Sequence, residues 1–337
     1  MSFLKNKNIL VTGADGFIGS HLVENLVSQG CNVRAMCIYN SFNSWGWLDT
    51  LDQNIINNID ITLGDIRDTK SVNNVCKKID YVFHLASLIA IPHSYDSPYS
   101  YLETNALGTM NIMEASINND VERVIHTSTS EVYGHLSTVP IKESNLTYAK
   151  SPYSATKIAA DQIAYSYYSS FNLPVSIVRP FNTYGPRQSN RAIIPTIITQ
   201  VLNNNKYIKL GSLYPTRDFS YIKDTVRGFL LTAKSKKSIG EVINIGSGYE
   251  ISIGDLYELI CDITESKIKI KTEKARVRPK KGEVYRLKAD NTKAKKLIGW
   301  TPQYKNKNGL IKGLIETIDW FKTKANLERY KSDRYTT

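Results

Sequence analysis

The sequence has few of the residues that build disulfide frameworks and metal sites. Its 337 residues include four cysteines and five histidines. The cysteines show no CxxC spacing, so we expect reduced, buried thiols and neither a disulfide nor a zinc site at Cys31, Cys37, Cys76 and Cys261. The histidines form no HExxH motif. The sequence therefore predicts no bound metal.

Long apolar runs are also missing. No stretch approaches the roughly 18 consecutive apolar residues that a transmembrane helix needs. The first apolar run, residues 9–12, is far too short for a secretion signal. Hydrophobic residues nevertheless make up 42% of the chain, which is ample for a folded core. We expect a folded cytoplasmic protein without a membrane partner.

Positive charge is in excess, with a formal net charge of +12. Much of the excess lies late, in residues 267–271 and 276–281, and the first of these alternates Lys with Ile as an exposed strand does. No aromatic residues interleave with these charges, as they would in a protein that binds single-stranded nucleic acid. We therefore expect no nucleic-acid partner and favour a local site for an anionic diphosphate.

Strand and helix patterns alternate through the first half of the chain. Short apolar runs predict strands at 8–12, 32–38, 60–63, 81–85, 123–127 and 175–179. Helical patterns lie between them, for example at 18–29 and 103–118. This alternation predicts an α/β fold of the Rossmann type, with a doubly wound parallel sheet.

The pattern changes after Pro180. A loop leads to a predicted helix at 193–203, a short strand near Tyr207 and a further strand at 241–245. We expect a smaller, mixed α/β C-terminal lobe. Residues 1–180 and about 218–250 would form the dinucleotide-binding domain, and residues 181–217 and 251–325 the lobe that binds a nucleotide sugar.

Three glycines, Gly13, Gly16 and Gly19, follow the first predicted strand and open a helix. Glycines at these places allow a tight turn, a close approach of backbone to a pyrophosphate, and close packing of helix on strand. The helix N-terminus then faces the phosphates. The motif in this context predicts a bound dinucleotide.

A second motif opens a later predicted helix, with Ser151 as the N-cap and Pro152 in the first turn. Tyr153 and Lys157 are spaced i, i+4, so both lie on one side of that helix. A nearby ammonium lowers the pKa of a phenol, and a phenolate can take the proton of a substrate hydroxyl as hydride leaves its carbon. The pair predicts hydride-transfer chemistry.

The GxxGxxG and YxxxK motifs together resemble the extended short-chain dehydrogenase/reductases, the NAD-dependent epimerase/dehydratase family. The resemblance implies catalytic roles for Thr129, Glu131, Tyr153 and Lys157, and a bracing role for Asn105. It implies cofactor contacts at Gly13, Asp15, Gly16, Phe17, Ile18, Gly19, Asp65, Ile66, Leu85, Ala86, Tyr153 and Lys157.

One position departs from the family pattern. Cys37 stands where the second strand usually ends in an acid that bonds the adenosine ribose. Without the acid nothing repels a 2′-phosphate, and without an arginine directly after it nothing binds one. The cofactor is therefore NAD or NADP, with NAD slightly favoured.

Glu131 distinguishes between reactions within the family. Sugar 4-epimerases carry a small neutral residue there, whereas a carboxylate resembles the 4,6-dehydratases, in which it removes the C5 proton. Oxidation at C4 acidifies C5, so a positioned base can drive loss of water across C5 and C6. Ser130 replaces the Asp of dehydratases that act on dTDP-glucose, which leaves Glu131 as the candidate for both base and acid. UDP-glucuronate decarboxylases share the Thr-Ser-Glu sequence, but their tyrosine helix differs.

Later segments resemble the family's substrate-binding loops. The substrate contacts implied are Ser130, Asn182, Arg187, Arg217, Asn244, Arg278 and Glu283. Residues 39–49 are similar to dehydratases of legionaminic acid pathways, which act on nucleotide-activated N-acetylglucosamine.

The leading hypothesis is a 4,6-dehydratase that converts GDP- or UDP-N-acetylglucosamine to a 4-keto-6-deoxy sugar nucleotide. A decarboxylase or 4-epimerase of the same family is the alternative, and a non-catalytic cofactor-binding protein is a third. The resemblance also implies a homodimer or homotetramer through helices 103–118 and 153–170.

Overall fold

The computed structural model describes residues 3–136, 138–277 and 279–331. Its larger sheet has seven strands in the order β10-β6-β5-β4-β1-β2-β3, all parallel. They are β1 (Asn8–Thr12), β2 (Asn32–Ile38), β3 (Ile59–Gly64), β4 (Tyr81–His84), β5 (Arg123–Thr127), β6 (Val175–Pro180) and β10 (Val242–Ile245). The Rossmann fold predicted from the alternation is confirmed.

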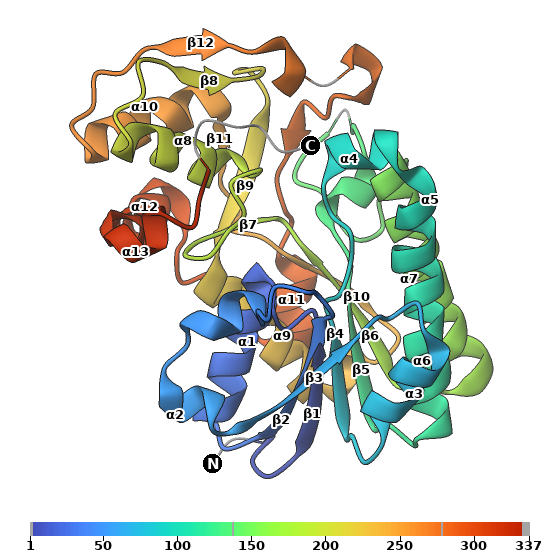
Figure 1. Cartoon of the computed structure of the whole chain (residues 1–337). Helices are drawn as coiled ribbons and strands as arrows, with labels where there is room; N and C mark the ends of the chain where they lie inside the picture. The colour runs from blue at the N-terminus through green and yellow to red at the C-terminus, as the bar shows by residue number, and fades with distance from the viewer. Residues whose placement is uncertain (1–2, 137, 278, 332–337) are drawn as a thin grey trace.

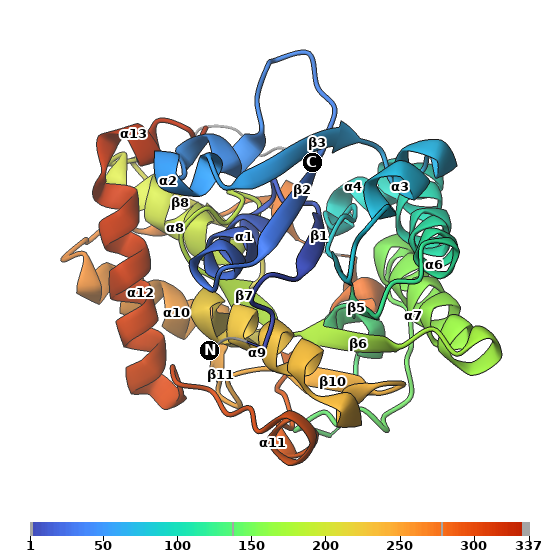
Figure 2. The same cartoon turned by 90° about the horizontal axis from the view of Figure 1, so that it is seen from below.

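Helices cover both faces of this sheet (Figure 2). One face carries α1 (Phe17–Ser28) and α9 (Ile222–Lys234); the other carries α3 (Thr69–Cys76), α6 (Gly108–Asn118) and α7 (Pro152–Phe171). Successive strand residues alternate between the two cores: Val11 packs with the α1 side and Leu10 with the α3 side. A parallel sheet buried on both faces explains the nearly continuous apolar runs of the strands.

A smaller lobe lies beyond the carboxyl ends of the large sheet, at the upper left of Figure 1. Its four-stranded sheet contains β7 (Asn182–Tyr184), β9 (Thr216–Tyr221), β11 (Glu250–Ser252) and β13 (Arg286–Leu287), and β8 (Ile208–Leu210) pairs separately with β12 (Ile270–Thr272). Its helices are α8 (Ile193–Leu202), α10 (Ile253–Ile263), α12 (Asn306–Lys322) and α13 (Lys324–Leu327).

The two-part division of the chain stays a prediction, and the strands refine where its boundaries could lie. β9 pairs within the smaller sheet, although residues from 218 on were expected in the Rossmann part. α11 (Thr292–Ile298), expected in the smaller lobe, contacts β10 of the large sheet. The path of the chain between the sheets is set by strand pairing, which local sequence patterns do not encode.

The predicted helix at 103–118 is confirmed, but its first turns are not α-helical. A π-helix covers Leu102–Leu107 before α6 begins, and it follows α4 (Ile91–Asp96) and α5 (Pro98–Tyr101). Such π segments are common at functional sites. The remaining short helices are α2 (Gln53–Ile56) and five 3₁₀ segments at Gly46–Thr50, Ser130–Tyr133, Lys236–Ser238, Lys274–Arg276 and Lys280–Gly282. Among the helices described, none is long and apolar enough to cross a membrane.

Candidate active site

The glycine turn after β1 is so close-packed that side chains do not fit. Gly13 has φ +68°, and a Cβ there would lie 2.9 Å from the backbone of Ala86. A Cβ on Gly19 would overlap the carbonyl oxygen of Gly13. The turn leads directly into α1, whose first residues are Phe17 and Ile18. The result is a cradle of bare backbone at a helix N-terminus, suited to a diphosphate.

The turn after β4 forms the neighbouring wall of this cradle. The amides of Leu85 and Ala86 both donate to Thr12 Oγ1, each over 3.1 Å. After β3, Ile66 is buried against Gly108 on α6. Asp65 is held by Arg67, whose side-chain hydrogen bonds lower the pKa of the carboxyl. The cofactor residues expected on β1, β3 and β4 thus gather at one end of the sheet.

Cys37, at the place where the family carries the ribose-binding acid, is buried. Its thiol is buried in the core, and this burial raises its pKa to about 12. The next residue, Ile38, is 51% exposed. Side chains alternate along a strand, so Cys37 points inward beneath the end of β2.

The start of α7 positions the tyrosine and the lysine. Ser151 and Ser154 form a reciprocal capping box, with the Ser154 amide 3.1 Å from Ser151 Oγ and the Ser151 amide 3.0 Å from Ser154 Oγ. Tyr153 is then 7% exposed and Lys157 3% exposed. The cap fixes the first turn of the helix, so both side chains are held toward the carboxyl end of β5.

Thr129, Glu131 and Tyr153 form one cluster. Burial raises the pKa of Tyr153 above its usual value, the hydrogen bond from the Thr129 side chain lowers it, and the charge of Glu131 raises it again. Glu131 is 9% exposed and lies in a 3₁₀ turn whose N-cap, Thr129, accepts from the Glu131 amide over 3.2 Å. Ser130 is buried in the same turn. A base, a hydroxyl and a phenol therefore meet at the end of β5.

Lys157 differs in part from its expected role of lowering the phenol pKa. Its Nζ donates to the carbonyl of Thr127 over 2.6 Å. Burial lowers the pKa of Lys157 to about 8, partly opposed by the charge of Asp161. Burial has the largest effect on the pKa of the Tyr153 phenol, so this pKa is raised rather than lowered.

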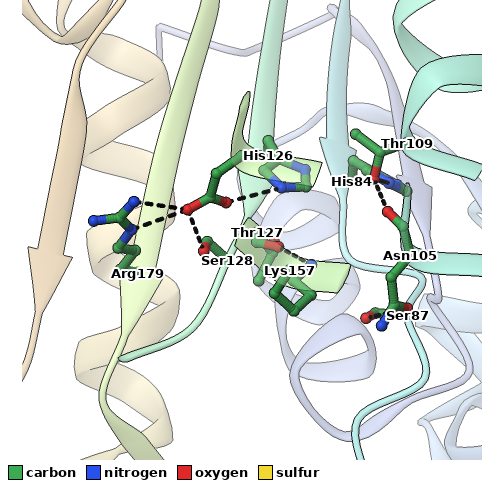
Figure 3. A network of polar contacts seen from close by, with 10 residues as sticks. His84, Ser87, Asn105, Thr109, His126, Thr127, Ser128, Lys157 and Arg179 are labelled. Carbon is green, nitrogen blue, oxygen red and sulfur yellow. Dashed lines mark hydrogen bonds and ion pairs between the residues drawn. The ribbon is translucent and has the colours of Figure 1, made fainter. Parts of the chain in front are cut away.

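A buried ion network joins α7 to β5 and β6 (Figure 3). Asp161 Oδ2 accepts from Arg179 Nε and Nη2, over 3.0 and 2.8 Å, and from Ser128 Oγ over 2.8 Å. His126 Nε2 lies 3.4 Å from the other carboxylate oxygen. Burial alone would raise the pKa of Asp161, but these contacts hold it below its usual value. Asp161 was not among the residues predicted from the sequence, although its place four residues after Lys157 puts it on the same helix face.

A second buried chain of hydrogen bonds links the cofactor turn to the π-helix (Figure 3). His84 contacts Thr12 Oγ1 over 2.8 Å and Thr109 Oγ1 over 3.1 Å, and Thr109 donates to the carbonyl of Asn105. Burial lowers the pKa of His84 well below its usual value, so the ring is neutral. The Asn105 side chain bonds Ser87, Leu88 and Thr156, which agrees with the expected bracing role.

Replacing Asp161 by asparagine is expected to lower the free energy of unfolding by about 3–5 kcal/mol, because it leaves the buried Arg179 guanidinium without its counter-charge. Urea unfolding of the purified chain measures the effect. The exposed pair of Lys322 and Asp319 supplies the control, since Asp319→Asn should change stability by less than about 1 kcal/mol. Equal losses in the two variants would show that the network contributes no more than a surface pair.

Lys157→Met is expected to stabilise the ligand-free chain near neutral pH. The pKa of Lys157 falls from 10.5 to about 8, and each unit corresponds to about 1.4 kcal/mol. The buried charge therefore costs up to about 3–4 kcal/mol below pH 8, a penalty that disappears as the pH rises toward the unfolded pKa. Unfolding at about pH 7 and about pH 10 should show the advantage of methionine shrinking. An advantage that grows with pH would contradict this pKa.

Two of the expected substrate residues, Asn182 and Arg217, lie in the smaller sheet, and a third, Glu283, lies just before its strand β13. Asn182 begins β7, and its buried Oδ1 has no hydrogen-bond partner within the described part of the chain. Arg217 on β9 donates to the carbonyl of Val284 over 2.7 Å and lies 3.5 Å from Glu283 Oε1. An unsatisfied buried amide oxygen and a buried guanidinium suit a polar, anionic ligand.

Two other expected substrate residues have different surroundings. Arg187 forms a two-pronged ion pair with Glu24 on α1, over 2.7 and 3.0 Å, which places it against α1 rather than with Arg217. Asn244 on β10 is fully buried, and its side chain bonds Tyr133 and the carbonyl of Ile141. Both side chains already have partners within the chain, and their substrate-binding roles stay predictions. Arg278 lies outside the described residues.

The chain matches a known protein family over most of its length. The family model described as GDP-mannose 4,6 dehydratase matches residues 10–312. The chain belongs to the NAD-dependent epimerase/dehydratase family. The extended short-chain dehydrogenase/reductase resemblance found in the sequence is thereby confirmed, and three relatives show how varied its reactions are.

A UDP-N-acetyl-alpha-D-glucosaminuronate decarboxylase of Bacillus cytotoxicus is 33% identical, covering 95% of this chain and 99% of the relative. Among solved structures, a UDP-N-acetylglucosamine 4-epimerase of Methanobrevibacter ruminantium is 33% identical, with TM-score 0.83 and coverage of 94% and 98%. A dTDP-glucose 4,6-dehydratase of Streptomyces venezuelae, solved with NAD bound, is 28% identical, with TM-score 0.83 and coverage of 94% and 97%. Similarity alone therefore leaves three reactions open.

Proposed function

We propose that this protein is an NAD-dependent nucleotide-sugar 4,6-dehydratase whose substrate is GDP- or UDP-N-acetylglucosamine. The observation that carries the proposal is the Glu131 carboxylate, buried beside Tyr153 and Thr129. An epimerase needs no acid or base at this point beyond the tyrosine, whereas elimination of water needs a base near C5.

The residues present fit a nicotinamide dinucleotide. The glycine cradle admits backbone contact with a pyrophosphate, and the buried ammonium of Lys157 lies near the tyrosine, where it can bond a ribose. When bound, the cofactor supplies a hydride acceptor that later returns the hydride. The relative from Streptomyces venezuelae was solved with NAD in place, which supports NAD here.

Tyr153 is the proposed base for the C4 hydroxyl. Its Oη takes the hydroxyl proton, and the hydrogen bond of the Thr129 side chain to the phenol stabilises the phenolate that does so. Burial raises the pKa of Tyr153, so positive charge beside the phenol is needed for the proton transfer. Lys157 supplies part of that charge below its pKa of about 8. The buried setting also excludes water.

Glu131 is the proposed base for the C5 proton and the acid for the departing C6 hydroxyl. Once C4 is a ketone, the C5 hydrogen is acidic enough for a carboxylate to remove. The carboxyl formed in that step then holds the proton that the C6 oxygen needs to leave as water. Ser130, a poor acid, is not assigned this task.

The test is a panel of nucleotide sugars incubated with the full-length chain and NAD, followed by mass spectrometry. A dehydratase produces a 4-keto product lighter by one water. A product of unchanged mass would favour the 4-epimerase, and loss of carbon dioxide from a uronate substrate would favour the decarboxylase. If the cofactor binds but no sugar reacts, the result would favour a non-catalytic cofactor-binding protein.

Two finer predictions accompany the proposal. The N-acetylglucosamine substrate rests on the resemblance of residues 39–49 to legionaminic acid dehydratases. A homodimer or homotetramer stays a prediction; apolar side chains on α6 and α7, including Met110, Tyr165 and Phe171, are exposed and available for such a contact.

A further inference from the structure

The end of β2 lacks the acid that usually selects the adenosine ribose of NAD. In Rossmann enzymes a carboxylate at this place bonds the ribose 2′-hydroxyl, and a nearby arginine instead accommodates a 2′-phosphate. Cys37 is turned into the core, and Ile38 offers no polar side chain. If the cofactor is NAD, as proposed above, another group must distinguish NAD from NADP.

Asp15 reaches the same place from a different element. It lies in the glycine turn between Gly13 and Gly16, and its Oδ2 is 3.4 Å from the amide of Ile38. Its carboxylate therefore spans from the turn to the last residue of β2. The resemblance implied a cofactor contact at Asp15, and the contact of Asp15 with β2 became apparent only in the structure.

The following loop holds Asp15 in position. The amide of Trp47 donates to the Asp15 carbonyl over 3.0 Å. Gly46 lies directly on Asp15: its φ is +60°, and a Cβ there would be 2.6 Å from the Asp15 carbonyl oxygen. Trp47 is in turn packed edge-on against Trp320 of α12, with ring centroids 5.7 Å apart. These contacts fix the backbone at Asp15 against the loop that follows β2.

Positive charge that could neutralise a 2′-phosphate is engaged elsewhere. Residues 37–51 contain no lysine or arginine. Arg34, within β2, bonds Asp60 over 2.7 Å and the carbonyls of Val75 and Lys77. Arg67, after β3, bonds both oxygens of Asp65.

Asp49, a carboxylate of the loop after β2, makes its hydrogen bonds within that loop. Asp49 accepts from Ser44 Oγ over 2.6 Å and from the amide of Trp45 over 3.1 Å. Both of these partners belong to the same loop as Asp49. Asp49 therefore serves as a matched control for Asp15: a carboxylate of the loop that packs on Asp15, with its hydrogen bonds made inside that loop.

We propose that Asp15 replaces the missing acid of β2, accepts a hydrogen bond from the adenosine 2′-hydroxyl of NAD, and excludes NADP by repelling its 2′-phosphate. The proposal rests on the proposed function, because it assumes that a nicotinamide dinucleotide lies along the glycine turn. It identifies the residue that decides between the two cofactors that the sequence left open.

The test compares NAD⁺ and NADP⁺ binding to the full-length chain, freed of nucleotide, by isothermal titration calorimetry. The titrations are run at about pH 8, because burial raises the pKa of Asp15 and the carboxyl must be ionised. We expect the parent to bind NAD⁺ at least about tenfold more tightly than NADP⁺. Asp15→Asn should reduce this ratio at least about tenfold, mainly through tighter NADP⁺ binding. Asp15→Ser repeats the test with a smaller neutral side chain.

The control and the possible failures separate the two proposals. Asp49→Asn should leave the ratio within about threefold of the parent. If both dinucleotides bind and Asp15→Asn does not change the ratio, or Asp49→Asn changes it equally, the assignment to Asp15 is overturned while the proposed function stands. If the parent binds neither dinucleotide, both proposals fail.

Discussion

Tyr153→Phe should oxidise its substrate about 10²–10⁴-fold more slowly than the parent, because the variant lacks the phenol that accepts the C4 hydroxyl proton. The ring still fills the buried site, and the glycine turn and Arg217 are unchanged, so cofactor and substrate should bind as before. The measurement is the growth of reduced-cofactor absorbance in a single turnover, with binding checked separately by calorimetry.

Tyr101→Phe is the matched control for this experiment. Tyr101 packs edge-on against Tyr153, with ring centroids 6.2 Å apart, but its hydroxyl donates to the carbonyl of Ala90. Its loss should change the rate only slightly. If Tyr153→Phe oxidises substrate at the parent rate, the hydride chemistry assigned to this site is wrong and the dehydratase proposal fails with it.

Glu131→Gln should stop the reaction after oxidation at C4 and before loss of water. The amide keeps the shape of the side chain but cannot remove the C5 proton, so loss of water should fall by about 10²–10⁴-fold. Oxidation at C4 depends on Tyr153 and should survive, so a 4-keto sugar should accumulate together with reduced cofactor. Absorbance follows the reduced cofactor, and mass spectrometry in deuterated water reports exchange at C5, which the variant should lack.

Glu143→Gln tests whether any nearby carboxylate would behave in the same way. Glu143 accepts from the amide of Asn244 over 2.8 Å, a contact that a glutamine oxygen can also make. This variant should eliminate water normally. Normal elimination by Glu131→Gln would instead show that Glu131 is not the base for the C5 proton.

Local patterns in the sequence predicted most of the Rossmann part. Strand and helix periods depend on residues a few positions apart, so the strands at 8–12 and 123–127 were placed to the residue. The spacing of Tyr153 and Lys157 likewise fixes a shared helix face before any tertiary contact forms. The glycine turn between the first strand and the first helix is likewise encoded by residues close together in the sequence, so it too could be predicted.

Pairings between distant segments had no such local signal. Arg187 binds Glu24, although the two lie 163 residues apart, because the loop after β7 passes α1. Asp161 meets Arg179 only because α7 packs beside β6. Neither side chain reveals its partner by spacing, and both contacts follow from how helices and strands are packed.

The sequence by itself determined the fold class, the cofactor cradle and the cluster of hydroxyl, carboxylate and phenol, since each is encoded within one element or at the ends of adjacent parallel strands. Only the tertiary structure decided which way Cys37 faces and that Asp15 reaches the end of β2. Inward or outward orientation depends on which face of a strand packs against the core, and the approach of a turn to a neighbouring strand depends on the twist and register of the whole sheet.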